Sequence, residues 1–355
     1  MSTAPPPTGR GTSERRAGAD AAAVARIAPL LMGESGAMRH LREDVVRAGR
    51  TALPVLVQGP TGAGKELVAR AVHVTSGRCG EFVAFNVCAV AEPLFEAAVF
   101  GSVRGAFTGA TADTPGYLTE AHRGTVFLDE IGGLPAAAQA KLLRAIETKV
   151  YRPVGARADR CSDFRVVSAT NDDVDQLVDA RRFREDLAER LAGIVLHVPP
   201  LAARRSDVPL LVRHFAVQVE GAEARAFTEA ALERLMAYDW PRNVRELRHV
   251  VARALAWCTG PVVDVEAVRQ ALPRRPPLAV SAGRDVDAAS AAQGRAAPPH
   301  TVDAERRELV ELLRVCAGDT ERAARTLGVA RATLYRRLER LGIRVKDVVS
   351  RARTG

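Results

Sequence analysis

Short runs of hydrophobic residues, separated by helical patterns, dominate the middle of the chain. The runs lie at residues 55–57, 82–85, 126–128, 166–169 and 194–198, and each is typical of a buried strand. Between them, hydrophobic positions recur at helical spacing, for example at Leu67, Val68, Ala71 and Val72 and at Leu142, Leu143 and Ile146. This alternation predicts an α/β fold with a mainly parallel sheet between helices.

The pattern divides the chain into a disordered N-terminus, an α/β unit, a helical subdomain, a flexible linker, a helical tail and a basic end. Their expected bounds, in that order, are 1–28, 29–200, 201–272, 273–302, 303–345 and 346–355. The expected strands stop after Pro199 and Pro200. The linker is rich in proline, alanine and serine, and the N-terminus lacks periodic hydrophobic positions, so neither predicts a packed core.

A glycine-rich stretch follows the first expected strand and precedes an amphipathic helix. In such a loop, backbone N–H groups and the helix N-terminus bind phosphate groups, and a lysine reaches the β- and γ-phosphate oxygens. The sequence therefore predicts an ATP site at Gly59, Pro60, Thr61, Gly62, Ala63, Gly64, Lys65 and Glu66. The alternative is a glycine turn beside a surface lysine.

Two acids, Asp129 and Glu130, end the run at 126–128, at the carboxyl edge of the sheet where ligands gather. Asp129 is expected to orient Mg²⁺, and Glu130 to polarise the attacking water. Glu66 stands where the general motif has Ser or Thr as a metal ligand. Asp129 is therefore expected to contribute more to metal binding, with water molecules at the remaining coordination positions. Alternatively, the two acids simply begin a loop.

Asn171 closes the run at 166–169 through Thr170. At this edge of the sheet its amide is expected to hydrogen-bond the γ-phosphate or the attacking water. The alternative interpretation of an asparagine at a strand end is a turn residue.

A small, flexible hexapeptide lies between the phosphate loop and the two acids. It consists of Gly105, Ala106, Phe107, Thr108, Gly109 and Ala110. With one aromatic residue at its tip, it is poorly suited to anchor a core. We expect it to project from the domain and contact a partner as the nucleotide turns over.

Composition narrows the class of protein. The chain has 355 residues, of which 47% are hydrophobic and 26% charged, as in a soluble globular protein. No hydrophobic run approaches the roughly 18–20 residues that span a bilayer, so no membrane association is expected. The five cysteines are scattered without a C-x-x-C pair, which favours reduced thiols in a cytoplasmic protein.

Basic charge concentrates at the C-terminus. The net charge is +9, and residues 331–355 hold eight Arg or Lys against two acids. Leu309, Leu312, Leu313 and Cys316 give one hydrophobic face to a first helix of this tail. A second short helix and a turn at Gly328 then lead into a third helix.

The third helix of the tail has the layout of a recognition helix that enters a DNA major groove. Its expected DNA-binding residues point away from the packed face and are Arg331, Thr333, Arg336 and Arg337. One such unit reads a half-site, so a dimer on a palindrome is expected. The alternative is a three-helix interaction module with a solvated basic face.

Six motifs occur in an order that resembles the central AAA+ domain of bacterial enhancer-binding proteins, the activators of sigma-54 RNA polymerase. They are the phosphate loop, the hexapeptide, Phe127–Ile131, Ala169–Asn171, Phe183–Leu187 with Arg190-Leu191, and Trp240–Leu247. The resemblance covers about residues 30–272, with 201–272 as the AAA+ lid, and the tail resembles the Fis-type helix-turn-helix. The hexapeptide is highly specific to this group, whereas the phosphate loop alone is not.

The resemblance implies further roles. Arg184 and Arg190 match arginines that reach the γ-phosphate of a neighbouring subunit and stabilise charge in the transition state. Without the motif, surface salt bridges to Glu185, Asp186 or Glu189 would be the favoured interpretation. The resemblance also implies that Arg245 contacts nucleotide from the lid, that Asn86 pairs with the catalytic Glu130, and that Phe107 and Thr108 engage the sigma factor.

The chain departs from the family in two places. Family members usually show Glu-Leu-Phe-Gly-His-Glu before the hexapeptide, whereas residues 98–103 here read Ala-Val-Phe-Gly-Ser-Val. Polar contacts that relay the nucleotide state to the hexapeptide are therefore expected to be weaker or rerouted. Most relatives also carry an N-terminal receiver or sensory domain, where this chain has about 28 residues.

These observations favour an ATP-driven activator of sigma-54 RNA polymerase. Its subunits are expected to form a ring, from a dimer up to a hexamer, because Arg184 and Arg190 act across an interface, while the tail binds enhancer DNA. One alternative is a nucleotide-sensing, DNA-bound repressor or scaffold with weak ATPase activity. Another is a general AAA+ remodeller such as a helicase loader.

Overall fold

The computed structural model describes residues 10–107, 109–273 and 320, and the chain divides into two units, residues 1–276 and 277–355. Thr320 alone is described in the second unit, so the helices and strands named below all belong to the first. The linker beyond residue 273, Thr108 and the expected DNA-binding residues Arg331, Thr333, Arg336 and Arg337 lie outside the described residues.

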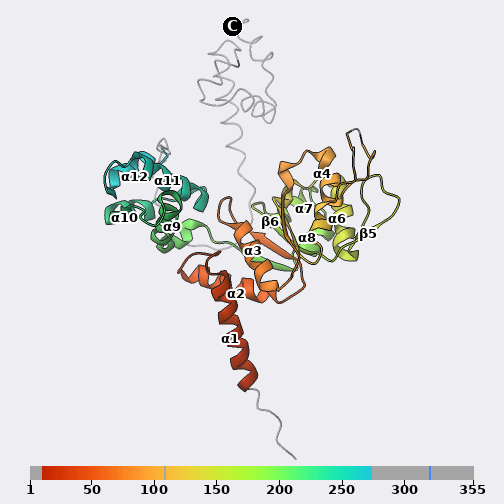
Figure 1. The fold of residues 1–355 in the computed structure, drawn as a ribbon, viewed down its shortest axis with the longest axis horizontal. Helices are drawn as coiled ribbons and strands as arrows, with labels where there is room; N and C mark the ends of the chain where they lie inside the picture. Colours follow the sequence, from red (N-terminus) through yellow and green to blue (C-terminus); the bar gives the residue numbers. More distant parts are fainter. Residues whose placement is uncertain (1–9, 108, 274–319, 321–355) are drawn as a thin grey trace, which may run out of the picture. The chain divides into compact units, whose positions relative to one another are not determined.

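Five parallel strands form the central sheet of the first unit, in the order β2-β3-β6-β1-β7 (Figure 1). Their bounds are Val55–Gln58 for β1, Phe82–Asn86 for β2, Thr125–Asp129 for β3, Arg165–Thr170 for β6 and Ile194–His197 for β7. Each coincides with one of the five predicted hydrophobic runs. The predicted α/β fold with a parallel sheet is therefore confirmed.

Helices cover both faces of the sheet. They are α2 (Gly36–Gly49), α3 (Lys65–Ser76), α4 (Glu92–Phe100), α5 (Tyr117–Glu120), α6 (Ala136–Thr148), α7 (Val174–Asp179) and α8 (Glu185–Leu191). Val55 and Val57 of β1 pack in the layer of α2 and α3, whereas Leu56 between them joins the layer of α4 to α8. Because both faces are buried, the strands read as continuous hydrophobic runs without alternation.

Residues 10–27 form α1 (Arg10–Ile27), which corrects the expectation of disorder over that range. Ala23, Val24 and Ile27 at its end join the hydrophobic layer of α2 and α3, and Ile27 is fully buried. Asp20 of α1 also pairs with Arg50. Alanine favours helix, but the packed hydrophobic side chains Ala23, Val24 and Ile27 fall within the last turns, so the sequence showed no helical period.

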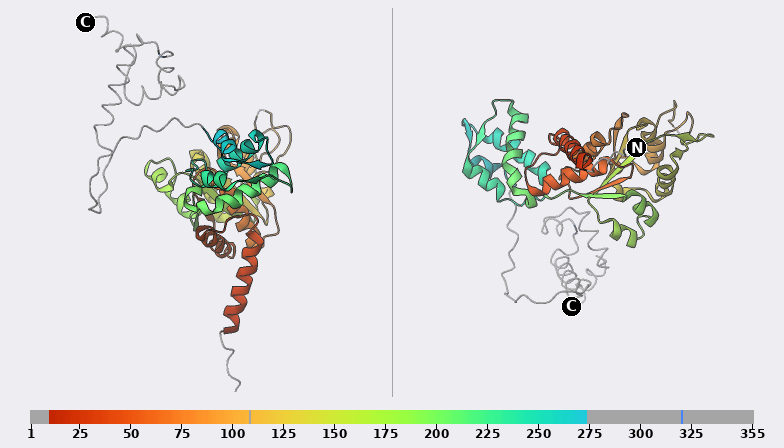
Figure 2. Two further views of the ribbon diagram at one scale, coloured as in Figure 1. Left: turned by 90° about the vertical axis from the view of Figure 1, so that its left-hand side faces the viewer. Right: turned by 90° about the horizontal axis from the view of Figure 1, so that it is seen from below.

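The helical subdomain, called the lid from this point, follows the sheet. Its helices are α9 (Val208–Glu220), α10 (Glu229–Met236), α11 (Asn243–Trp257) and α12 (Val265–Ala271), and they gather into one bundle (Figures 1 and 2). Trp240 is almost fully buried in their core, and its indole Nε1 donates to the carbonyl of Leu235 at 2.9 Å.

Four short strands were not predicted. In the lid, β8 (Ala226–Phe227) pairs with β9 (Val262–Val263), which corrects the expectation that strands stop at Pro200. In the α/β subdomain, β4 (Val150–Tyr151) and β5 (Arg160–Cys161) form an antiparallel pair. Strands of two residues leave no period in the sequence, because tertiary contacts alone define them.

Across the described residues, no helix combines the length and the hydrophobicity that a membrane crossing requires.

Candidate functional site

The phosphate loop connects β1 to α3, as the sequence predicted. Gly62 and Gly64 have φ of 76° and 107°, left-handed values that favour glycine. They turn the chain so that α3 begins at Lys65. Lys65 Nζ donates to the carbonyl of Gly59 at 2.9 Å, so the ammonium group lies over the loop where phosphates bind.

Asp129 and Glu130 lie at the carboxyl end of β3. Asp129 is level with Asn86 of β2 in the sheet register, and its Oδ1 accepts the backbone N–H of Glu130 at 3.1 Å. Glu130 has φ of 58°, which is rare for a residue other than glycine and is typical of residues held in place for function.

Burial and charge act against each other at this edge of the sheet. Burial lowers the pKa of Lys65, while Asp129 and Glu130 raise it and Arg245 lowers it. Burial raises the pKa of Asp129, and the neighbouring Lys65 lowers it. Because the charges of Asp129, Glu130 and Arg245 all act on Lys65, these four side chains form one electrostatic cluster.

The site has one strong candidate for a metal ligand. Across the described residues, no group of three or more His, Cys, Asp or Glu side chains could hold a metal ion. A half-buried carboxylate beside a lysine-bearing phosphate loop fits Mg²⁺, because this ion usually binds one or two carboxylates together with phosphate oxygens and water. The residues present therefore fit the expected role of Asp129.

Asn86 is placed beside the two acids but makes a different contact from the one that the resemblance implied. Its Oδ1 accepts the backbone N–H of Cys88 at 2.8 Å and caps the short helix η1 (Val87–Ala89). The Cys88 thiol lies near the Glu130 carbonyl, with Sγ and O 3.9 Å apart. Pairing between Asn86 and Glu130 remains a prediction.

Asn171 follows β6 and lines a cavity of about 530 Å³ together with Gly59 and Pro60 of the phosphate loop. The adjacent Thr170 carbonyl accepts the backbone N–H of Gly59 at 3.3 Å. The end of β6 is thus in contact with the start of the phosphate loop, as the expected role of Asn171 requires.

The lid contacts the phosphate loop through the start of α11. The backbone N–H of Arg245 donates to the carbonyl of Gly62 at 3.2 Å, which places this predicted residue at the site. Asn243 Nδ2 donates to the carbonyl of Thr61 at 3.1 Å. Arg204, almost fully buried, donates through Nη2 to the carbonyl of Ala63 at 3.0 Å.

Asn243 and Arg204 were not predicted from the sequence as site residues. Asn243 lies within the Trp240–Leu247 motif, so that motif could have indicated it. Arg204 stands in a charged stretch, and nothing in its surroundings in the sequence marks it as buried.

A largely hydrophobic cavity of about 410 Å³ adjoins the phosphate loop. Ala63, Gly64 and Leu67 line it from the loop and α3, and lid residues such as Phe215 and Val244 line it too. Leu30, Leu31 and Met32 contribute from the segment after α1. Its place and lining suit a nucleobase, and the sequence did not predict it because its lining comes from several segments far apart in the chain.

Arg184 and Glu66 pair with neighbours in the same chain. The guanidinium of Arg184 binds the Asp186 carboxylate through two hydrogen bonds of 3.0 and 2.7 Å, the surface pairing noted as the alternative. The Glu66 carboxylate pairs with Arg70 on α3 at 2.9 Å. Arg190 is exposed at the end of α8.

The hexapeptide forms the tip of a hairpin. Ser102 and Thr114 pair at its base, and the backbone N–H of Gly105 donates to the carbonyl of Ala110 at 2.8 Å. Gly105 and Gly109 have φ of 80° and 101°, and a Cβ at either would meet nothing within 4 Å. Phe107 is 40% exposed. The tip therefore stands free of the core, as predicted.

A second loop supports this hairpin. The segment between β4 and β5 lies beside it, because Val103 N–H donates to the Val154 carbonyl at 3.1 Å and Val154 N–H to the Gly101 carbonyl at 2.9 Å. Ser102 and Val103 stand where family members usually have His and the second Glu. Both hold the two loops together through backbone hydrogen bonds. The contact is thus independent of the missing side chains.

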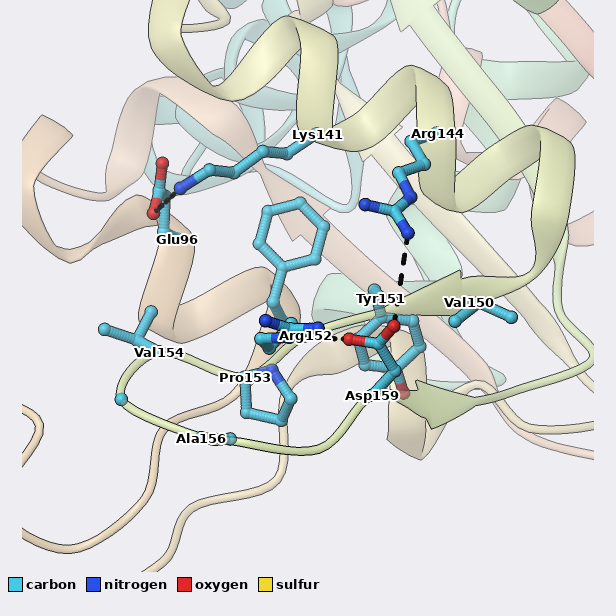
Figure 3. Close-up of a pocket in the computed structure, with 12 residues that line it drawn as sticks. Glu96, Lys141, Arg144, Val150, Tyr151, Arg152, Pro153, Val154, Ala156 and Asp159 are labelled. Atoms are coloured by element: carbon cyan, nitrogen blue, oxygen red, sulfur yellow. Dashed lines mark hydrogen bonds and ion pairs between the residues drawn. The ribbon is translucent and has the colours of Figure 1, made fainter.

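A cavity of about 390 Å³ lies under these loops and away from the phosphate loop (Figure 3). Lys141 of α6 pairs with Glu96 of α4 at 2.5 Å, and Arg152 pairs with Asp159 at 2.6 Å within the β4–β5 loop. Arg144 of α6 lies 4.0 Å from the same Asp159 carboxylate. The contact of Arg144 with Asp159 holds the β4–β5 loop to α6. The pair of Lys141 with Glu96 holds α4, the helix that precedes the hairpin, to the same helix.

A strand, a phosphate-binding loop and a helical lid that contacts it define a nucleotide-binding ATPase of the AAA+ class. Consistent with this, residues 31–197 match the family described as the sigma-54 interaction domain, and residues 202–282 match the AAA+ ATPase lid domain. Residues 302–341 match the bacterial regulatory proteins of the Fis family.

Curated relatives include transcriptional regulators of several bacteria. The DNA-binding transcriptional regulator NtrC of Rhizobium meliloti is 38% identical over 339 residues, which are 89% of this chain and 70% of the relative. The transcriptional regulator VasH of Vibrio cholerae is 39% identical over 337 residues, which cover 88% of this chain but 63% of VasH. The chain thus spans about two thirds of the length of these relatives.

Solved structures agree with these relatives. NtrX from Brucella abortus in complex with ATP has a TM-score of 0.61 and 32% identity, over 88% of this chain and 69% of NtrX. The ADP complex of NtrX has a TM-score of 0.63 and 30% identity, over 94% and 73%. The chain belongs to the bacterial transcriptional regulators that combine a sigma-54 interaction domain, which is an AAA+ ATPase domain, with a Fis-type helix-turn-helix.

Proposed function

We propose that this protein is a sigma-54-dependent transcription activator that hydrolyses ATP to open promoters. Family membership supports the role, and the observation that carries it is the joint presence of a complete phosphate site and a free-standing hexapeptide. The first supplies energy from ATP, and the second offers a flexible contact for a partner. A sensor or scaffold would need neither Glu130 nor the exposed tip.

Hydrolysis in this proposal is in-line attack by water on the γ-phosphate of ATP. Glu130 accepts a proton from the attacking water, the new P–O bond forms, and the bond from the γ-phosphorus to the bridging oxygen breaks to leave ADP. Lys65 and the loop N–H groups hold the phosphates. Asp129 would hold Mg²⁺, which neutralises phosphate charge when bound, and Asn171 would position the water.

The remaining groups of the reaction come from a second subunit. Arg184 and Arg190 would reach the γ-phosphate of a neighbour and stabilise charge in the transition state. In the single chain Arg184 pairs with Asp186, so this role requires the guanidinium to leave that carboxylate for the phosphate. A ring, from dimers up to a hexamer, would supply that neighbour at each site.

The nucleotide state would reach the polymerase through the hexapeptide hairpin. Phe107 and Thr108 would contact sigma-54 in the closed promoter complex, supported by the β4–β5 loop. The C-terminal tail would bind enhancer DNA through Arg331, Thr333, Arg336 and Arg337. Because bacterial DNA lies in the cytoplasm, ATP hydrolysis and promoter opening would take place there. The match of residues 302–341 to the Fis family supports the tail's role.

Two variants of the purified full chain test this function. Glu130→Gln should lower ATPase turnover by about 10²–10⁴-fold while nucleotide still binds, because the base is lost and the phosphate loop is intact. Thr108→Ala should keep ATPase turnover and lose transcription from a sigma-54 promoter in vitro.

The outcomes separate the alternatives. Unchanged turnover in Glu130→Gln would favour the nucleotide-sensing repressor or scaffold. Full transcription activation by Thr108→Ala would favour a general AAA+ remodeller that does not use the hexapeptide.

A further inference from the structure

Arg204 is a buried arginine in the short helix η3 (Leu201–Asp207), which leads into the lid, and it is only 4% exposed. Its Nη2 donates to the Ala63 carbonyl of the phosphate loop at 3.0 Å, and its Nη1 contacts Met38 Sδ at 2.9 Å. Across residues 10–107 and 109–273, no ion pair includes Arg204, and its Nε has no hydrogen-bond partner. Because a thioether sulfur is a weak acceptor, the Ala63 carbonyl is the strong acceptor that this guanidinium binds.

Stability alone does not account for this buried cation. Burial lowers the pKa of Arg204, and the nearby Asp207 raises it. The Asp207 carboxylate, however, accepts the backbone N–H groups of Glu34 and Ser35 and the Ser35 hydroxyl at 2.7–2.8 Å. An unpaired buried donor costs about 1–3 kcal/mol, and hydrophobic residues often replace buried ions without loss of stability. The bond from Arg204 to the phosphate loop therefore indicates a role beyond packing.

The peptide bond between Ala63 and Gly64 converts this contact into a direction. It is trans, so its carbonyl and its N–H point to opposite sides of the chain. Since the Ala63 carbonyl faces Arg204, the Gly64 N–H faces away from it. Within the described part of the chain this N–H has no acceptor, and it directly precedes Lys65 at the start of α3. A backbone donor in this place is suited to bind an anion.

We infer that Arg204 is a positioning residue that orients the Ala63–Gly64 peptide, so that the Gly64 N–H binds a phosphate oxygen of the nucleotide. The inference rests on the proposed function, in which this loop binds the phosphates of ATP. A donor that is held in its bound direction before the ligand arrives binds more tightly than one that must be ordered on binding. Arg204 therefore acts through the loop and does not itself contact the phosphates.

The alternative is that Arg204 acts through the nucleobase. Arg204 also lines the hydrophobic cavity of about 410 Å³ beside the phosphate loop. A residue that serves this cavity would affect adenosine and ADP alike, whereas one that orients the Gly64 N–H would affect only the ligand with phosphates.

Arg204→Met separates the two roles, because methionine fills much of the same space and has no donor. Displacement of a fluorescent ADP analogue from the full chain measures the affinities for ADP and adenosine. Arg204→Met should bind ADP about tenfold more weakly, because the N–H loses its fixed direction. Its affinity for adenosine should stay within about twofold of that of the unaltered chain, because adenosine has no phosphate.

Two further variants serve as rescue and as control. Arg204→Lys keeps the charge and a donor, so its affinity for ADP should return to within about threefold of that of the unaltered chain. Arg205→Met makes the same change at the next residue. The Arg205 side chain binds the Met236 carbonyl at 3.0 Å and Asp239 at 2.8 Å, away from the phosphate loop. Arg205→Met should bind both ligands like the unaltered chain.

Nuclear magnetic resonance of the unaltered chain tests the orientation even where Arg204→Met fails to fold. Carbon-13 at the carbonyl of alanine and nitrogen-15 at the amide of glycine select the Ala–Gly peptides. The signal that Ala63→Ser removes belongs to Gly64. ADP should move this amide proton downfield, because a hydrogen bond to a charged phosphate is strong and deshields the proton, and adenosine should leave it in place.

Three results would overturn the inference while the ATPase function stands. They are ADP binding by Arg204→Met that matches the unaltered chain, equal losses for ADP and adenosine, and a Gly64 signal that ADP does not move. Failure of the proposed function looks different, because the unaltered chain itself would then bind no ADP. In that case the inference fails with it.

Discussion

Asp129 carries a carboxyl group whose burial raises its pKa although Lys65 lies nearby and lowers it. A carboxylate binds a metal cation only in its charged form, so protons and Mg²⁺ compete for it. Because the pKa is raised, protons begin to compete at a higher pH than they would at an exposed aspartate.

We therefore expect the apparent Mg²⁺ affinity of the site to weaken as pH falls. The weakening should begin at a pH above the ordinary pKa range of aspartate. Binding of a fluorescent ATP analogue to Glu130→Gln across Mg²⁺ concentrations and pH values measures it. Asp159→Asn in the same background is the control, since its carboxyl lies outside the nucleotide site. A Mg²⁺ requirement that stays constant down to pH 4.5, roughly the ordinary range, would contradict the expectation.

Arg165 of β6 is a buried cation without a carboxylate partner among the described residues. It donates through Nη2 to the carbonyl of Ala48 at 2.7 Å and through Nη1 to that of Gly49 at 3.2 Å, at the end of α2. Burial, with Arg78 nearby, lowers the pKa of Arg165 to about 10. Its hydrogen bonds to the last carbonyls of a helix offset the cost of burying its charge.

Arg165→Met should lower the free energy of unfolding by about 1–3 kcal/mol, because the buried Gly49 carbonyl loses the donor that Arg165 supplies. Urea denaturation measures the change. Arg157→Met, at an exposed position, should stay within about 0.5 kcal/mol of the unaltered chain. Equal stabilities for the two variants would show that water replaces the lost donors of Arg165.

At the scale of elements, the phosphate loop and α11 meet so closely that no side chain fits between them. Gly62 has φ of 76°, and a Cβ there would overlap the Arg242 carbonyl oxygen and lie 3.0 Å from the Arg245 Cβ. The lid therefore contacts the phosphate loop through backbone atoms, and this contact determines how closely α11 approaches the loop.

Gly62→Ala should weaken ATP binding by about tenfold or more, since α11 must move off the loop and the residue adopts a strained left-handed φ. Gly77→Ala isolates the strain, because Gly77 has φ of 68° and a Cβ there meets nothing within 4 Å. Calorimetric titration with ATP measures both variants. Equal affinities would show that strain alone, rather than the contact with α11, determines the effect.

At the scale of the whole molecule, the proposed function implies that the single chain holds an incomplete ATPase site. Lys65, Asp129 and Glu130 gather at one edge of the sheet, whereas Arg184 is bound to Asp186 on α8. Under the proposed function, each complete site takes its phosphate loop and acids from one subunit and its arginine from the next.

A mixture of Arg184→Ala and Glu130→Gln should regain ATPase activity that neither protein has alone. A site is complete where a subunit with intact Glu130 has a neighbour with intact Arg184. In rings with the two proteins in random order, about a quarter of the sites meet this condition. Steady-state ATPase assays across mixing ratios measure the recovery. A mixture as inactive as its components would place Arg184 outside the neighbour's site.

The sequence was enough for the elements whose cause is local. Five hydrophobic runs gave the five strands, and the glycines of the phosphate loop gave the turn into α3, since backbone freedom and burial act within a few residues. The order of the motifs gave the family. It did not reveal α1, which is anchored by hydrophobic residues of its last turns and by the pair of Asp20 with Arg50.

What the sequence by itself determined, then, is the sheet, the phosphate loop, the two acids after β3 and the exposed hexapeptide. Tertiary structure alone decided that Asn243 and Arg204 hold the phosphate loop, that several separate segments line the hydrophobic cavity beside this loop, and that the β4–β5 loop supports the hexapeptide hairpin. Those contacts join residues far apart in the chain, and their geometry follows from how whole elements pack rather than from any local pattern.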